Sequence, residues 1–314
     1  MKKIDREDIQ IFSRHGDLTE KGIDRALHQN VYNDKEAWQK FFQLFVLTLG
    51  VGFTVSGIVF FFAYNWADLH KFVKIGLTEG LVIATTLMVL FPKLNDNIRN
   101  IILTGASVLV GVLFAVFGQI YQTGANAYDF FLAWTIFVTL WVMISNFAPL
   151  WMLYLVLTNT TILLYSQQVA ADWSDVFICA SLFIINVVVL ICAIYFGKKK
   201  IPSWFTNTLA LASAGYATIG IVIGIFDKPQ TPFFLLIPAT AMAFALGIWH
   251  GLKVKSNFYL SIIPLSLIII VSALLIKISD GEMMFLLVSL FIVGSVTFTI
   301  KNLIDIQKKW NNEK

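Results

Sequence analysis

Long apolar runs, separated by short polar segments, make up most of this chain. The charge-free runs are 41–67, 100–128, 130–171, 176–197, 201–226, 229–252, 256–276 and 283–300. Their lengths are close to or above the roughly 20 residues with which a helix crosses the hydrocarbon layer of a membrane. The run 130–171 carries Asn146-Phe147-Ala148-Pro149 near its middle, which predicts two helices and a tight turn. A helix over 72–91, with the single charge Glu79, brings the predicted number of transmembrane helices to ten.

Composition supports the membrane interpretation. The chain is 58% hydrophobic and 13% charged, and its mean hydropathy is +0.76. Soluble domains carry about 25% charged residues. The sequence therefore predicts an all-α, polytopic membrane helix bundle whose main partner is the lipid bilayer, and it indicates no nucleic-acid binding.

Lysine and arginine residues predict the orientation, because they resist translocation across the membrane. With the amino terminus inside, 19 of the 23 Lys and Arg residues lie in the inner segments. The outer segments hold only Lys71, Lys74, Lys228 and Lys277. Both termini are predicted to be cytoplasmic.

The amino-terminal 40 residues are charged and predict a cytoplasmic helical hairpin. Asp5 is placed to cap a first helix that ends at Gly16, and 17–20 is a capping-box-like start for a second. This hairpin is interpreted either as a packing and insertion element or as a docking site for a cytoplasmic protein partner.

The predicted organisation has four parts. The cytoplasmic tail covers 1–40, and the first membrane half, with five spans, covers 41–170. The second half, also with five spans, covers 171–304, and a cytoplasmic carboxy-terminal tail covers 305–314. The connections are short, so function is expected within or beside the bilayer.

Polar residues gather in the predicted outer segments of the first half. Glu79 is a carboxylate inside a span, and Asn159 is an amide near a midplane, where it should bond a neighbouring helix. The outer connections add amides, aromatics and carboxylates. The candidate substrate-binding residues are Glu79, Asn159, Asn65, Trp66, Gln119, Tyr121, Gln122, Asn126, Tyr128 and Asp129. Two interpretations stay open: an interfacial aromatic belt with capped loops, or a cavity-lining outer vestibule.

Patterns for catalysis and for cofactors are missing from the sequence. Only four His residues occur, and Cys179 and Cys192 lie 13 residues apart in one span. No clustered metal ligands, phosphate-binding loop or activated nucleophile is indicated. We therefore expect no metal, no cofactor and no enzyme activity.

Several outer motifs resemble a family of predicted bacterial membrane proteins, domain of unknown function 2157. The motifs are Phe62-Ala63-Tyr64-Asn65-Trp66 with Lys74, Gly118-Gln119-Ile120-Tyr121-Gln122 continuing to Tyr128, Trp134, Leu150-Trp151 and Asn159. The resemblance covers roughly residues 1–170. It implies a bacterial cytoplasmic (inner) membrane location but supplies no activity.

Three functions are compatible with the sequence. The first is a carrier or flippase for a polar or cationic solute or a lipid headgroup, which enters from the outer vestibule and passes Glu79 and Asn159. The second is a non-transporting envelope sensor or scaffold that uses residues 1–40 to bind a partner. A third is a membrane-embedded transferase with Asp129, Asp172 or Asp175 as its base.

Overall fold

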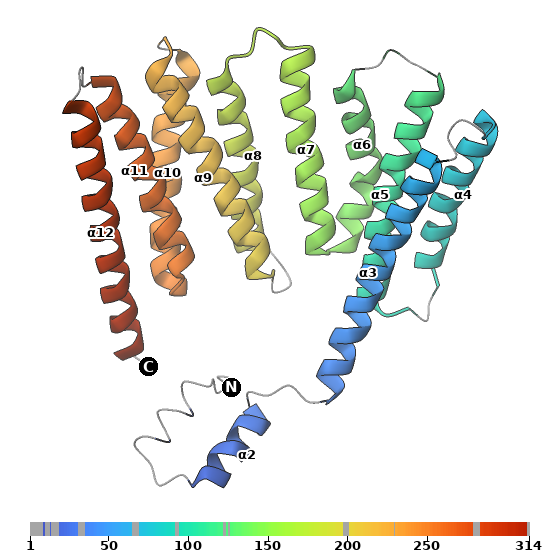
Figure 1. The fold of residues 1–314 in the computed structure, drawn as a ribbon, viewed down its shortest axis with the longest axis horizontal. Helices are drawn as coiled ribbons and strands as arrows, with labels where there is room; N and C mark the ends of the chain where they lie inside the picture. Colours follow the sequence, from blue (N-terminus) through green and yellow to red (C-terminus); the bar gives the residue numbers. More distant parts are fainter. Residues whose placement is uncertain are drawn as a thin grey trace. The chain divides into compact units, whose positions relative to one another are not determined.

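The computed structural model describes residues 9, 13, 19–30, 35–64, 69–91, 94–121, 124, 126–196, 201–228, 230–278 and 283–312. Within these residues the chain forms eleven helices and no strand, as the all-α prediction requires (Figure 1). The helices are α2 (Glu20–Asn30), α3 (Lys35–Tyr64), α4 (Lys71–Val89), α5 (Asp96–Tyr121), α6 (Ala127–Ser145), α7 (Ala148–Gln168), α8 (Asp175–Phe196), α9 (Ser203–Phe226), α10 (Thr231–Val254), α11 (Asn257–Ile278) and α12 (Met283–Asn312).

Ten of the described helices, α3 to α12, are long and apolar enough to cross a membrane, which confirms the predicted number. By their contacts the residues form two compact units, 1–120 and 121–314. The first unit holds α2 to α5, apart from the last residue of α5. The second holds α6 to α12, which run up and down alternately (Figure 1).

The amino-terminal helix α2 begins at a threonine cap. The Thr19 carbonyl accepts hydrogen bonds from the amides of Gly22 and Ile23 at 2.8 and 3.0 Å. The Thr19 hydroxyl accepts a further bond from the Gly22 amide at 3.3 Å. The second predicted hairpin helix is thus present, although its cap is Thr19. Most of the first predicted hairpin helix lies outside the described residues.

In the first unit, α5 carries most of the buried side chains, among them Ala106 and Val110, both at 0% exposure. Gly105 allows α3 to approach α5, because a Cβ atom there would lie 2.5 Å from Cγ1 of Val51. α4 and α5 are also joined. The Arg99 side chain, near the start of α5, donates to the Val89 carbonyl at the end of α4 at 3.1 Å.

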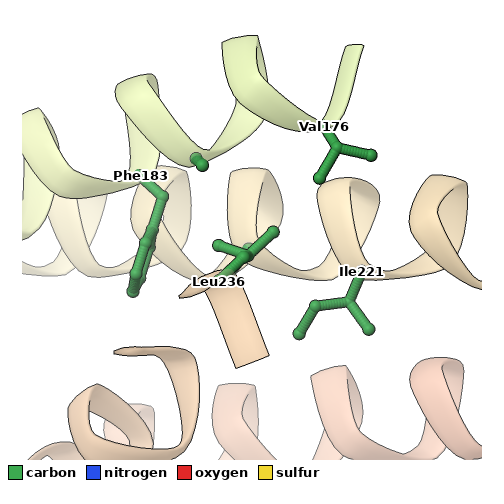
Figure 2. Close-up of a cluster of buried hydrophobic side chains, with 6 residues drawn as sticks. Val176, Phe183, Ile221 and Leu236 are labelled. Carbon is green, nitrogen blue, oxygen red and sulfur yellow. The ribbon is translucent and has the colours of Figure 1, made fainter. Parts of the chain in front are cut away.

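One cluster of buried apolar side chains in the second unit lies where α8, α9 and α10 meet. Val176 and Phe183 of α8 pack with Ile221 of α9 and Leu236 of α10 (Figure 2). Gly220 of α9 permits this approach, since a Cβ atom there would be 2.8 Å from both a Cys179 and a Leu236 carbon. In a bilayer, small residues favour such close helix packing.

The predicted break in the run 130–171 is present between α6 and α7. Asn146 ends α6 in the left-handed conformation, with φ of 47°, which Asn tolerates better than most residues. Pro149 lies in the first turn of α7, where its missing amide hydrogen costs no helical bond. The tight turn brings α6 and α7 side by side and antiparallel, and so positions their other ends together.

Candidate functional site

The best-defined polar structure in the predicted outer segments lies where α6 begins and α7 ends. The Asp129 carboxylate accepts a hydrogen bond from the Asn126 amide at 3.1 Å, which caps α6. The Gln168 side chain, on the last residue of α7, accepts the Tyr128 amide at 3.0 Å. Both acceptors satisfy amides that have no partner inside a helix. These bonds fix the two helix ends to each other.

A row of aromatic rings crosses the same end of α6, α7 and α8. The ring of Tyr128 contacts that of Tyr165 edge-to-face, with centroids 5.3 Å apart. Tyr165 contacts Trp173 at 5.4 Å, and Trp173 contacts Phe177 at 5.0 Å, both edge-to-face. The α7–α8 turn places Trp173 in this row, because its amide bonds the Ala170 carbonyl at 2.9 Å. We call these four residues the aromatic row.

Charge in the chain segment that carries the aromatic row is exclusively negative. Asp129 lies beside Tyr128 in a half-buried position, and Asp172 and Asp175 flank Trp173 with exposed side chains. From residue 100 to residue 197 the sequence has these three carboxylates and no Lys, Arg or His. The aromatic row therefore has three carboxylates and no cation in its own segment of the sequence.

Deeper in the same three helices, polar side chains pair across the helix interfaces. The hydroxyls of Thr135 on α6 and Thr161 on α7 lie 3.4 Å apart. Further along, the hydroxyls of Thr139 and Tyr154 lie 3.3 Å apart. In addition to these contacts between helices, each of the three threonine hydroxyls donates to a carbonyl of its own helix. None of them therefore lacks a partner.

Asn159 forms the strongest of these interhelical pairs. Its side-chain amide donates to Oδ1 of Asn186 on α8 at 3.3 Å, and Asn186 donates back to Oδ1 of Asn159 at 3.1 Å. Asn186 also donates to the Leu182 carbonyl at 2.8 Å and is 1% exposed. The expected bond from Asn159 to a neighbouring helix is confirmed.

The structure brings together only part of the predicted residue set. Asn126, Tyr128 and Asp129 are adjacent, and Asn159 lies deeper in the same group of helices. Glu79 lies on the exposed face of α4 in the first unit, and Gln119 and Tyr121 are exposed near the end of α5. The remaining three candidates, Asn65, Trp66 and Gln122, lie outside the described residues.

Two residues outside the predicted site set have notable surroundings in the structure. Asn186 is the only amide in the apolar run of α8, and that isolation was a signal that it pairs with another buried amide. Lys74 is one of the four cations of the outer segments, at the start of its helix, and it is 8% exposed and lies on the buried face of α4 with Thr78 and Val82. These three residues are spaced four apart in the sequence, which places their side chains on the same face of a helix.

Among the described residues no group of His, Cys, Asp and Glu is placed to hold a metal ion. The two cysteines, both on α8, are free thiols. The chemistry offered by the site is thus that of aromatic faces, carboxylates, amides and hydroxyls, which suits noncovalent binding of a polar or positively charged group.

Comparison with known proteins gives one family. The profile of the predicted membrane proteins with domain of unknown function 2157 (DUF2157) matches residues 14–151, which include α2 to α6 and the start of α7. No curated protein and no solved structure matches the chain. The matched segment covers the helical tail, the Gly118–Gln122 motif and the cap of α6, and it supports a membrane location. Residues 14–151 of this chain thus carry the DUF2157 membrane-protein region that the motifs indicated.

Proposed function

We propose that this membrane protein is a carrier or flippase for a cationic solute or for a lipid headgroup that carries a quaternary or primary ammonium group. The observation that carries the proposal is the aromatic row, Tyr128, Tyr165, Trp173 and Phe177, beside Asp129, Asp172 and Asp175. Carboxylates attract a cation, and aromatic rings bind ammonium groups through their negative faces.

The energies are appropriate for reversible binding. A single cation–π contact contributes about 0.5–1 kcal/mol at an exposed site and about 2 kcal/mol or more when it is desolvated. Trp173, Tyr165 and Tyr128 are half-buried, so two or three such contacts contribute about 1–6 kcal/mol before the cost of association is subtracted, and the binding they support is weak. Weak binding is suited to a carrier, which must also release its cargo.

The polar pairs below the aromatic row support passage through the same helices. A cargo headgroup that leaves the row next meets the Thr135–Thr161 hydroxyls, and then the Asn159–Asn186 amides. The hydroxyls and amides of these pairs can form hydrogen bonds to a ligand in place of the bonds they form to each other. In this proposal the pairs are closed at rest and open transiently to the cargo.

The distribution of Lys and Arg supports an outward-facing position for the aromatic row. The 19 Lys and Arg residues of the inner segments support a topology with both termini in the cytoplasm and the α7–α8 turn on the opposite side. With the bacterial family resemblance, this gives the cytoplasmic membrane as the proposed location and the extracytoplasmic face as the entry side.

The test uses the full chain reconstituted in liposomes. Uptake of radiolabelled choline tests the carrier, and dithionite reduction of fluorescent NBD-phosphatidylcholine tests the flippase. We expect Trp173→Ala to lower the active rate about tenfold or more, since it removes the ring that joins the row. Trp204→Ala is the matched control, because Trp204 is exposed at the start of α9, at the other end of the unit.

Two results would contradict the proposal. One is wild-type liposomes that neither take up choline nor flip the lipid above the rate of protein-free vesicles. The other is equal activity of the Trp173→Ala and Trp204→Ala variants at matched reconstitution. Circular dichroism of both variants in micelles checks that the helices are intact.

A further inference from the structure

A cavity of about 160 Å³ lies between α8, α9, α10 and α11 of the second unit. It is partly open at the surface and lined mainly by hydrocarbon side chains. An apolar cavity of similar volume in another protein stays dry and binds a benzene-sized molecule. The space therefore suits an apolar group of that size, continued outward through the open side.

The cavity follows from where small residues lie. α9 contributes Ala210, Ser213 and Ala214, and α10 contributes Ala243 and Gly247. Opposite them, α8 presents longer side chains from Phe183 to Ile194. Gly247 cannot be replaced by a larger residue without displacing Ile263, since a Cβ atom there would lie 2.7 Å from Cδ1 of Ile263. The hydroxyl of Ser213 bonds the Leu209 carbonyl at 2.7 Å, so it adds little polarity to the lining.

One end of the cavity is polar, and that end coincides with helix ends. Tyr195 is the penultimate residue of α8, His250 lies in the last turns of α10, and Tyr259 lies in the first turn of α11. The rings of His250 and Tyr259 meet edge-to-face at 5.3 Å. Aromatic residues with a polar tip are favoured where a membrane meets water. The cavity thus has an apolar body and an interfacial mouth.

Two lysines lie near this mouth, at the end of α10. Lys253 and Lys255 lie at the end of α10, and the ammonium of Lys253 stands 4.9 Å above the ring of Trp249, an exposed residue. Between residues 176 and 279 the sequence has a single carboxylate, Asp227. That residue follows α9 and precedes α10, and so lies at the opposite ends of these helices. The mouth accordingly complements a negative headgroup.

We infer that this cavity binds one acyl chain of an anionic phospholipid from the surrounding bilayer, with the lipid phosphate at Lys253 and Lys255. The chain occupies the space beside Ala243 and Gly247, and the headgroup meets the cationic rim beside His250. The site lies at the Tyr195 end of α8, whereas the aromatic row lies at the Asp175 end. The inference therefore stands whether or not the aromatic row binds cations.

The experiment measures lipid binding by the detergent-solubilised full chain with native mass spectrometry. Phosphatidylglycerol is titrated in parallel with phosphatidylcholine of the same acyl chains. We expect phosphatidylglycerol to bind at least tenfold more tightly. Lys253→Gln should weaken its binding about fivefold, the effect of one lysine near an anionic surface. Lys277→Gln is the matched control, since Lys277 also lies near an aromatic ring, that of Phe226, but at the far end of α11.

The acyl-chain half of the inference has its own variant. Ala243→Leu fills the cavity and should abolish the preference for phosphatidylglycerol. A photoactivatable diazirine at the end of the acyl chain checks the same point in the unmodified protein, and its adducts should map to the lining residues of α8 to α11. This second measurement decides the question if Ala243→Leu does not fold.

Three outcomes would overturn the inference. They are equal binding of the two lipids, equal weakening by Lys253→Gln and Lys277→Gln, and diazirine adducts confined to helices other than α8 to α11. Equal binding of the two lipids would contradict the anionic headgroup. Equal weakening by the two lysine variants would contradict the position of the phosphate at Lys253. The third would remove the cavity as the site of the acyl chain.

Discussion

Replacing the paired asparagines of α7 and α8 tests how these helices are held together. Asn159 and Asn186 share two hydrogen bonds of 3.3 and 3.1 Å, and Asn186 is 1% exposed. Asn159→Leu keeps a side chain of similar length but leaves Oδ1 of Asn186 without its donor. Asn186→Leu has the reciprocal effect on Asn159. The double variant removes both amides and leaves neither without a partner.

The size of the effect follows from the number of bonds. An interhelical hydrogen bond in a membrane protein contributes about 0.6 kcal/mol on average and at most about 1.7 kcal/mol. Two bonds thus give a coupling energy of about 1–2 kcal/mol. Each single variant should lower the free energy of unfolding by about 1–3 kcal/mol, because a buried amide is left unsatisfied. The double variant should lose less than the sum of the two single losses.

Reversible unfolding by SDS in mixed micelles, followed by circular dichroism, measures these free energies. Thr158→Val is the control, because the Thr158 hydroxyl bonds only the Tyr154 carbonyl of its own helix, at 2.9 Å. We expect that control to change stability by less than about 0.5 kcal/mol. Additive effects of the two asparagine variants, within about 0.3 kcal/mol, would refute the pairing. Activity of the double variant then separates the two roles of the pair: loss of transport at unchanged stability indicates a place on the cargo path.

Three further changes test other parts of the structure. Gly220→Ala should lower the free energy of unfolding by about 1–3 kcal/mol through overpacking, whereas Gly215→Ala, with open space around it, should be neutral or stabilising in the same SDS titration. Thr240→Val should leave stability unchanged or raise it by about 1 kcal/mol, because the Thr240 hydroxyl is buried and has no hydrogen-bond partner among the described residues; a loss above 1 kcal/mol would contradict this reasoning. Glu79→Gln should abolish choline uptake or lipid flipping without altering the melting curve if the carboxylate lies on the cargo path, and unchanged activity would exclude that role.

Much of the fold could be predicted because membrane insertion imposes simple length and polarity requirements. A helix that crosses lipid must be long and apolar, so ten such runs predicted ten helices, which α3 to α12 confirm. The break at Asn146 and Pro149 was visible for the same reason: an amide that tolerates left-handed backbone precedes a proline suited to a first helical turn. The bond of Asn159 to another helix followed from the cost of an unsatisfied amide in lipid.

The candidate site was predictable only in part. The sequence indicated Asn126, Tyr128 and Asp129 as polar residues at the end of a span, but it could not show that Asp129 caps α6 or that Gln168 bonds the Tyr128 amide. The bond between Gln168 and Tyr128 joins residues 40 positions apart, and the turn at Asn146 sets its register. The exposure of Glu79 and the burial of Lys74 on one helix likewise depend on which face of α4 meets other helices.

The sequence by itself determined that this chain is a multi-pass membrane protein and how many helices are long enough to cross the membrane, because hydrophobic length is a property of neighbouring residues. It did not determine every helix end, since α3 begins at Lys35 and α12 continues to Asn312, both beyond the predicted apolar runs. Only the tertiary structure decided which helices touch. Helix contacts in lipid depend on the fit of small and large side chains and on a few polar pairs, not on overall hydrophobicity, since the lipid is as apolar as the helices. The pairing of Asn159 with Asn186, the aromatic row and the cavity beside Gly247 all arise at that level.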